Sequence, residues 1–359
     1  MINSFTYIIA EAGVNHNGDI NLAKELIDIA ADCGANAIKF QTFKADKLAH
    51  RSLKKATYQI KESSIKENQY EMLKKLELSK SDHYVLIKRA HRKGIDFLST
   101  PFDEESLDFL SELDIPFLKI PSGEVSNLPF LWRIASKGKP MILSTGMSDM
   151  KEIDEALATI NHGLTNKQEP KNLKEVFSQW DIKKAKKLLK NKIFILHCTS
   201  QYPAAYEEIN LLAMQTIAKK FSLPVGYSDH SLDNHISIAA VSLGARIIEK
   251  HITINKEMDG PDHSASLDPD EFRIFVKNIR SLENSLGNGK KNIEKSVKDV
   301  KKVIEKQIIS IKSIKAGEEF TKNNISVSRC GEGISAKRFW EVLGTTSKYD
   351  FDKGQIIKK

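Results

Sequence analysis

Short apolar runs rich in β-branched residues recur along this 359-residue chain, and longer stretches with helical periodicity separate them. This alternation is typical of βαβ units, in which helices join parallel strands and cover the sheet. About eight runs occur, the number that a closed barrel requires. The expected strands are Tyr7–Gly13, Ala37–Thr42, Asp96–Thr100, Phe117–Ile120, Met141–Thr145, Ile193–Thr199, Val225–His230 and Arg246–His251. The chain is therefore expected to be an α/β protein built on a (β/α)8 TIM barrel.

Two connections between the expected strands are longer than usual. Phe43–Leu76 follows the second strand on its C-terminal side, where it is expected to contribute to a lid over the active site. His162–Lys192 is expected to add a helix at the opposite end of the barrel. Glycines that precede a strand are expected to cap helices in the left-handed conformation, and these are Gly34, Gly94, Gly138 and Gly244.

The sequence changes character after Leu286. Residues 287–306 are rich in lysine and are expected to form a charged linker between a catalytic barrel, residues 1–286, and a small domain, residues 307–359. Short β-like pieces alternate with turn signals in the small domain, namely Ile308–Ile311, Ile325–Ser328 and Gln355–Ile357. About fifty residues rarely form a stable core alone. We therefore expect this domain to pack on the barrel or on another subunit.

Composition excludes several classes of protein. No segment has the roughly 18 consecutive apolar residues of a membrane span, and the first residues do not resemble a signal peptide, so a cytoplasmic protein is expected. Three scattered cysteines do not support a disulfide framework or a cysteine zinc site. The net charge of +8 comes from lysine clusters without interleaved aromatic residues, which favours anionic substrates over nucleic acid.

Reactive side chains stand at the carboxyl ends of the expected strands, the face on which barrel enzymes carry their chemistry. Lys39 and Lys119 lie inside apolar runs, where an unpaired ammonium would be costly to bury. They are expected either to form ion pairs with a barrel glutamate or to meet an anionic ligand such as a phosphate and a carboxylate. The ring of strand-end residues also includes Glu11, Gln41, Thr100, Ser122, Glu124, Ser144, Ser228 and Glu249.

Two histidines, His230 and His251, end consecutive strands, which places their rings side by side at one rim. Such a pair can hold a divalent metal ion while leaving coordination positions open to substrate. The same two residues could equally be hydrogen-bonded core or surface histidines. The positions of these rings in the structure therefore decide whether a metal site is plausible.

An ordered set of motifs resembles the sialic acid synthases. The set spans the whole barrel and includes IIAEAGVNHNG, IKFQTF, STPF, KIPSGE, LSTGM, LHCTSQYPA, GYSDHS, EKHIT and GPDHSASLDP. The tail, SIKAGEEFTKNNISVSRCGEGIS, is similar to the antifreeze-like domain that follows the barrel in that family. The resemblance implies that phosphoenolpyruvate adds to the aldehyde of an N-acetylmannosamine-type sugar and that phosphate leaves. N-acetylneuraminate and N,N'-diacetyllegionaminate synthases fit better than pseudaminate synthases.

The same resemblance implies roles for individual residues. His230 and His251 correspond to the ligands of manganese or magnesium, and Glu124 corresponds to the carboxylate that handles the water attacking C2. Contacts to phosphoenolpyruvate are implied for Lys39, Lys119, Ser122, Ser228, Gln41, Thr100 and Ser200, although some members carry asparagine at the last position. Sugar contacts are implied for Glu11, Tyr202, Asp262 and Arg329.

The resemblance also implies a domain-swapped homodimer, because Arg329 corresponds to an arginine that enters the partner subunit's site. Two other classes of protein fit the same barrel. A Schiff-base aldolase would use Lys39 or Lys119 as the nucleophile, and it would not need a metal ion. A sugar-binding protein without activity would not need the complete ring of anion, metal and carboxylate candidates.

Overall fold

The structure is a computed structural model that describes residues 5–52 and 68–358. The chain divides into two compact units, Met1–Gly287 and Asn288–Lys359. Part of the expected lid, residues 53–67, lies outside the described residues. Each unit is considered by itself below.

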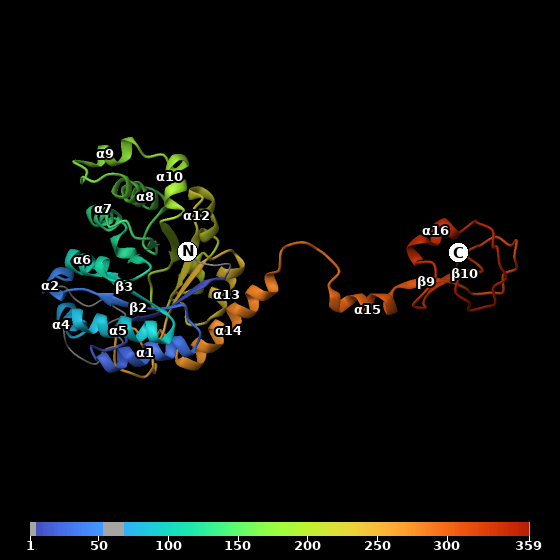
Figure 1. The fold of residues 1–359 in the computed structure, drawn as a ribbon, viewed down its shortest axis with the longest axis horizontal. Helices are drawn as coiled ribbons and strands as arrows, with labels where there is room; N and C mark the ends of the chain where they lie inside the picture. Colours follow the sequence, from blue (N-terminus) through green and yellow to red (C-terminus); the bar gives the residue numbers. More distant parts are fainter. Residues whose placement is uncertain (1–4, 53–67, 359) are drawn as a thin grey trace. The chain divides into compact units, whose positions relative to one another are not determined.

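Eight parallel strands form the centre of the first unit, and the TIM-barrel prediction is confirmed (Figure 1). Ladders run in the order β3-β2-β1-β8-β7-β6-β5-β4, and β3 lies beside β4 where the ring closes. Every strand begins and ends within one residue of its predicted bounds. The strands are β1 Tyr7–Gly13, β2 Ala37–Thr42, β3 Asp96–Pro101, β4 Leu118–Ile120, β5 Met141–Ser144, β6 Ile193–Cys198, β7 Val225–Asp229 and β8 Ile247–His251.

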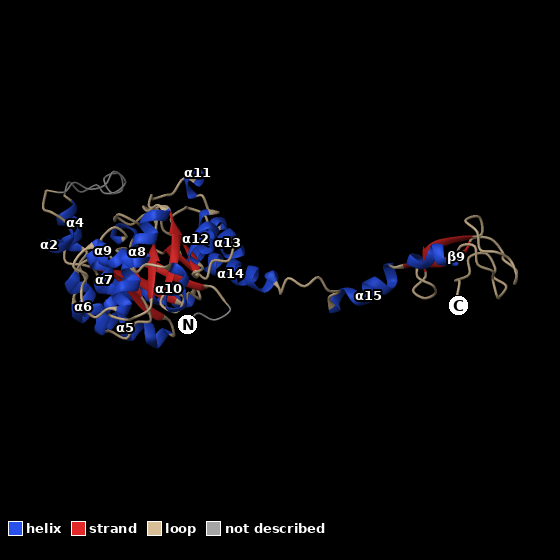
Figure 2. Cartoon of the chain, turned by 90° about the horizontal axis from the view of Figure 1, so that it is seen from above, coloured by secondary structure: helices blue, strands red, loops and turns tan. Residues whose placement is uncertain are grey.

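Helices surround these strands, as Figure 2 shows with the strands in red and the helices in blue. The main helices are α1 Ile20–Asp32, α5 Lys80–Lys93, α6 Glu104–Glu112, α7 Leu128–Ser136, α8 Met150–Thr165, α12 Ala213–Phe221, α13 His235–Ser242 and α14 Pro269–Leu286. Short helices in the connections are α2 Ala45–Leu48, α4 Gln69–Lys75, α9 Leu173–Ser178, α10 Ile182–Leu189 and α11 Tyr206–Ile209. The four glycines expected to cap helices all have positive φ, which confirms that prediction.

The second long connection differs from the expectation of one added helix. Its first residues extend α8 as far as Thr165, and two short helices, α9 and α10, then follow. Trp180, between them, donates a hydrogen bond from Nε1 to Asp154 of α8 at 3.1 Å. The insertion therefore lies against the outside of the barrel.

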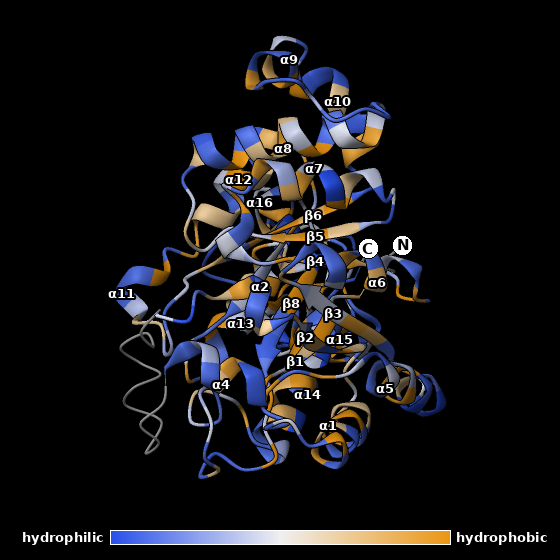
Figure 3. Ribbon diagram, turned by 90° about the vertical axis from the view of Figure 1, so that its left-hand side faces the viewer, coloured by the Kyte–Doolittle hydropathy of each residue, from blue (hydrophilic) through white to orange (hydrophobic). Residues whose placement is uncertain are grey.

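Side chains alternate between the two faces of each strand and so build two separate apolar layers. The outward residues pack against helices whose apolar sides can be followed in orange in Figure 3. The inward residues at the strand starts fill the bottom of the barrel, and they include Ile9, Leu98, Phe117, Ile142 and Ile247. This apolar floor closes the barrel from below, so the inward residues further along each strand face a space that opens only at the C-terminal end.

The second unit has its own small core, which includes Ile308, Ile314, Phe320, Ile325 and Ile357. Strands β9 (Lys306–Ser310) and β10 (Ile325–Arg329) pair antiparallel, as in a β-clip domain. The third expected strand, Gln355–Ile357, is not a strand, because only Ile356 forms a bridge, to Ile309. The unit also contains α15 (Lys295–Ile304), η2 (Ala336–Arg338) and α16 (Phe339–Val342). Across both units, no helix of the described residues is long and apolar enough to span a membrane.

Candidate active site

A cavity of about 440 Å³ lies at the C-terminal ends of the barrel strands. Residues from all eight strands line it, because the inward positions of β1 to β8 point toward the barrel axis. Most predicted site residues line it together: Glu11, Lys39, Gln41, Thr100, Lys119, Ser122, Ser200, Tyr202, Ser228, His230 and His251. The polar ring expected from the strand ends is thus a single site.

Two buried lysines reach this cavity from β2 and β4. The Nζ atom of Lys39 lies 2.5 Å from a carboxylate oxygen of Glu11 and donates to the hydroxyl of Thr100 at 3.1 Å. The Nζ atom of Lys119 lies 3.1 Å from Oε1 of Glu249. Both lysines therefore form ion pairs with barrel glutamates.

Glu249 belongs to the ring of strand-end residues expected from the sequence, but no role was predicted for it. Its Oε1 atom accepts from Lys119 and from the hydroxyl of Ser228 at 2.9 Å, and its Oε2 atom lies 3.6 Å from Nζ of Lys39. The signal was present in the sequence, because Glu249 stands two residues before His251 in one strand and must face the same side. Gln69, Phe102, Ser144, Met147 and Cys198 also line the cavity and were likewise given no role.

The charges in this cluster stabilise one another. Burial by itself would raise the pKa of Glu249, but the positive charges of Lys119 and Lys39 outweigh it and lower that pKa to about 2. Burial raises the pKa of Glu11 to about 7, although Lys39 opposes the shift. The carboxylates of Glu11 and Glu249 outweigh the burial of Lys39 and raise the pKa of its ammonium. Glu249 is therefore ionised at neutral pH, whereas Glu11 can exchange a proton there.

The rings of His230 and His251 face one another, with centroids 5.6 Å apart and planes at 70°. The Nδ1 atom of His230 lies 2.7 Å from the carbonyl oxygen of Thr199, so Nδ1 carries the proton and Nε2 carries the lone pair. That Nε2 atom lies 3.0 Å from the hydroxyl of Tyr202. The His230 ring thus presents toward the cavity a nitrogen that could bind a metal ion.

His251 has the complementary property of an unused nitrogen. Its Nδ1 atom is buried and has no hydrogen-bond partner among the described residues; Oδ2 of Asp262 is 4.0 Å away. Burial, the largest cause, holds the pKa of His251 well below its usual range, so the ring is the neutral form that can bind a metal ion. The described residues contain no group of three or more metal-binding side chains. Two imidazoles with open positions beside them are what this site offers to a divalent ion.

A buried ion pair on the outer face of the barrel joins β7 to β8 next to the two histidines. Nζ of Lys250 lies 3.2 Å from Oδ2 of Asp229, and the hydroxyl of Ser237 on α13 donates to the same oxygen at 2.6 Å. Asp229 precedes His230, and Lys250 precedes His251. The outward residues therefore join β7 to β8 directly behind the inward histidines.

Three predicted site residues do not line the cavity. Asp262 is buried close to Glu11, which does line the cavity. Gly13 lies between their carboxylates: a Cβ added to it would be 3.7 Å from Oδ2 of Asp262 and 3.5 Å from Oε1 of Glu11. Glu124, in the short helix η1 (Ser122–Glu124), accepts a hydrogen bond from the amide of Asn127 at 2.6 Å. Arg329 ends β10 in the second unit with its side chain exposed.

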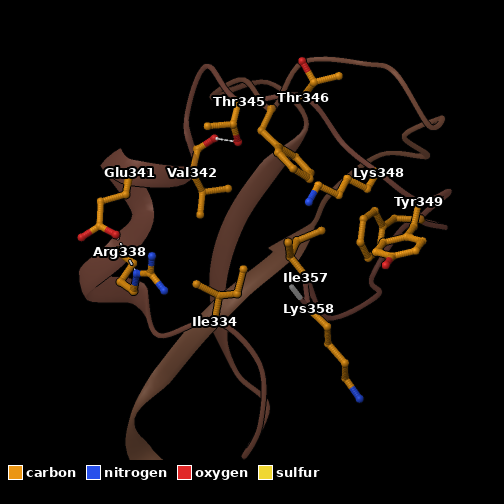
Figure 4. A pocket seen from close by; sticks show the side chains of 12 residues that line it. Ile334, Arg338, Glu341, Val342, Thr345, Thr346, Lys348, Tyr349, Ile357 and Lys358 are labelled. Atoms are coloured by element: carbon orange, nitrogen blue, oxygen red, sulfur yellow. Dashed lines mark hydrogen bonds and ion pairs between the residues drawn. The ribbon is translucent and has the colours of Figure 1, made fainter.

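A second cavity, of about 400 Å³, lies in the second unit (Figure 4). Ile334, Val342 and Ile357 contribute apolar surface, and the carboxylate of Glu341 accepts from Nε of Arg338 at 2.6 Å. Its lining residues include neither histidine nor cysteine. This cavity therefore lacks the reactive groups that converge in the barrel.

Comparison with known proteins shows which family this chain resembles. The model of the NeuB family matches residues 26–291. Two similar proteins are named N,N'-diacetyllegionaminic acid synthase. The one from Campylobacter jejuni is 45% identical over 99% of both chains, and the one from Legionella pneumophila is 43% identical over 98% of this chain and 93% of the relative.

A solved structure of a related synthase is also similar to this chain. It is an N-acetylneuraminic acid synthetase from Leptospira borgpetersenii in complex with citrate, with a TM-score of 0.65 and 33% identity. The match covers 82% of this chain and 90% of that one. Together with the family match over most of the barrel, these likenesses show that the chain belongs to the NeuB family.

Proposed function

We propose that this protein is a sialic-acid-type synthase, which condenses phosphoenolpyruvate with an N-acetylated aminosugar to a nine-carbon 2-keto sugar acid and phosphate. One observation carries the proposal: a single cavity holds two buried lysines, several hydroxyls and two facing imidazoles. The names of the two relatives above support N,N'-diacetyllegionaminate as the product, with a 2,4-diacetamido-2,4,6-trideoxymannose acceptor. N-acetylmannosamine and the pseudaminate precursor are the alternative acceptors.

The lysines and hydroxyls would bind phosphoenolpyruvate. Lys39 and Lys119 supply positive charge, and Thr100, Ser122 and Ser228 supply hydroxyl donors around it. Ser200 and Gln41 line the same cavity and complete the set. Held in this way, C3 of phosphoenolpyruvate can be aimed at the aldehyde carbon of the acceptor, an orientation that free solution rarely provides.

His230 and His251 would hold a manganese or magnesium ion, because one ring has its Nε2 lone pair and the other an unused nitrogen at the cavity. When bound, such an ion polarises the acceptor's aldehyde and stabilises the negative charge that forms on its oxygen. Tyr202 stacks on His230 with ring centroids 4.1 Å apart and would help to position the sugar.

Carboxyl groups would accept a proton from the attacking water and bind the hydroxyls of the acceptor. The new bond joins C3 to the aldehyde carbon and leaves C2 electron-poor, water adds at C2, and the C2–O bond to phosphate then breaks to leave the keto group. Glu124 is proposed to take the proton from this water, for which its side chain must turn from Asn127. Glu11 and Asp262 are proposed to bind acceptor hydroxyls, and burial raises the pKa of Asp262 to about 6.

The second unit is proposed to complete the site of another subunit. Arg329 is exposed and would reach the acceptor's N-acyl group in a domain-swapped homodimer. A cytoplasmic location stays a prediction, which fractionation of cells would test.

The test is a phosphate-release assay with phosphoenolpyruvate and each candidate acceptor, with and without manganese. We expect phosphate release with the diacetamido sugar, loss of it after chelation, and recovery on adding manganese. No release with any acceptor would refute the synthase. Activity after chelation, together with covalent trapping of pyruvate by borohydride, would instead identify a Schiff-base aldolase.

A further inference from the structure

Glu249 occupies the donors that a bound phosphoryl group would need. Lys119 and the hydroxyl of Ser228 both donate to its Oε1 atom, and Lys39 lies 3.6 Å from its Oε2 atom. The side chain is 6% exposed and fully within the barrel. An anion entering the cavity must therefore share or displace these contacts.

The lysines and the carboxylates that line the cavity are equal in number. Its lysines are Lys39 and Lys119, and its carboxylates are Glu11 and Glu249. A cradle built only for affinity would leave both ammonium groups unpaired, because each nearby carboxylate repels a phosphate.

We propose that Glu249 is a positioning residue that competes with phosphoryl groups for Lys39, Lys119 and Ser228. It holds the two ammonium groups in place in the free protein and keeps the affinity for inorganic phosphate low, so that this product can leave. This inference rests on the proposed function, in which phosphate is a product. Tighter binding of substrate and product alike would not raise kcat, because it does not favour the transition state.

The variant Glu249→Gln tests this directly, because its shape is retained and its amide oxygen can still accept from Ser228. Binding of inorganic phosphate to the full-length protein is measured by calorimetry at a fixed manganese concentration. We expect the dissociation constant to fall about tenfold or more, since one buried negative charge near the phosphate is removed. The KM for phosphoenolpyruvate should fall in parallel, kcat should not rise, and the KM of the acceptor should change little.

Two further variants separate competition from a structural role. Glu249→Asp keeps the charge, so its phosphate affinity should stay close to that of the natural protein. Glu283→Gln is the matched control: it removes another buried carboxylate, which pairs with Arg280 at 2.9 Å and does not line the cavity. This control should leave phosphate binding unchanged.

Unchanged or weaker phosphate binding by Glu249→Gln would overturn the proposal, because a residue that merely supports the lysines would weaken binding when altered. An equal gain in Glu283→Gln would overturn it as well, by showing a general effect of charge. Phosphate binding is measured for both variants without any catalytic turnover. Failure of the synthase assay by the natural protein would therefore be a separate result, one against the proposed function.

Discussion

Lys119 owes its position to one carboxylate. The variant Lys119→Met removes the ammonium that pairs with Glu249. Glu249 then stays buried, and Lys39, 3.6 Å from its Oε2 atom, is the lysine that still pairs with it. Breaking a buried ion pair costs about 3–5 kcal/mol, so urea unfolding should show a loss of that size. The KM for phosphoenolpyruvate should rise at least about tenfold, because losing a hydrogen bond to a charged group costs about 1.5 kcal/mol or more. An unchanged KM would remove Lys119 from the anion site.

Glu124 presents a different situation, because its carboxylate bonds to Asn127 and does not line the cavity. The variant Glu124→Gln should keep the KM for phosphoenolpyruvate and lower kcat by about 100-fold or more, as is typical when a general base is lost. Steady-state phosphate release measures both constants. A kcat close to normal would assign the attacking water to another group, with Glu11 the first candidate.

His16 lets the effect of acid on folding be predicted. Its ring is fully buried, and burial lowers its pKa from 6.5 to about 4. Between these values the unfolded chain binds a proton that the folded chain does not, so this contribution to stability is complete above pH 6.5 and is lost as the pH falls toward 4.

The test compares the natural protein with His16→Asn, because Glu11 and Asp262 have raised pKa values and titrate in the opposite sense. Between pH 7 and pH 4, the natural protein should lose up to about 3 kcal/mol more of its free energy of unfolding than the variant does. Urea unfolding at several pH values measures this difference. Parallel curves for the two proteins would contradict it.

At the scale of elements, periodicity alone predicted the barrel strands, because buried parallel strands read as short apolar runs between helical segments. Polar residues at the ends of those runs then predicted which side chains gather around one cavity. Glu249 was in this ring but received no role, since the sequence does not reveal which of several inward residues touch. Glu124 follows Ser122 by two residues, yet its orientation depends on a local bond to Asn127.

Elements without a strong repeat were predicted less well. The helices α9 and α10 have only six and eight residues, too few for a clear helical period. Gln355–Ile357 has β-like composition, but a run of three residues can pair through one bridge without forming a strand. The spacing of apolar residues therefore predicts a helix or strand only where the element is long enough for that spacing to recur.

Gly226 of β7 offers a test at the same scale. An added Cβ would lie 2.4 Å from the carbonyl oxygen of Ile247 and 2.6 Å from Cδ2 of Leu196, inside the barrel. Gly226→Ala should therefore destabilise the protein by about 1–3 kcal/mol through overpacking. Thermal unfolding measures the loss, and an unchanged Tm would show that β7 can shift to admit the methyl group.

At the scale of the whole molecule, the proposed exchange of second units can be tested by mixing two inactive variants. Glu124→Gln disables the barrel site, and Arg329→Ala disables the contribution of the second unit. If each Arg329 serves the partner's barrel, mixed dimers regain one intact site, and about a quarter of full activity should return after subunits exchange randomly. Phosphate release by the refolded mixture measures this recovery. No recovery, despite mixed dimers seen by mass spectrometry, would place Arg329 in its own subunit's site.

The ion pair between Asp229 and Lys250 also bears on how metal loading depends on folding. Because it joins two neighbouring strands behind the histidines, it holds together the backbone segments that carry the two imidazoles. An ion that binds such a prearranged pair spends little of its affinity on ordering the chain. If His230 and His251 hold an ion as proposed, removing it should therefore leave the pairing of β7 with β8 unchanged.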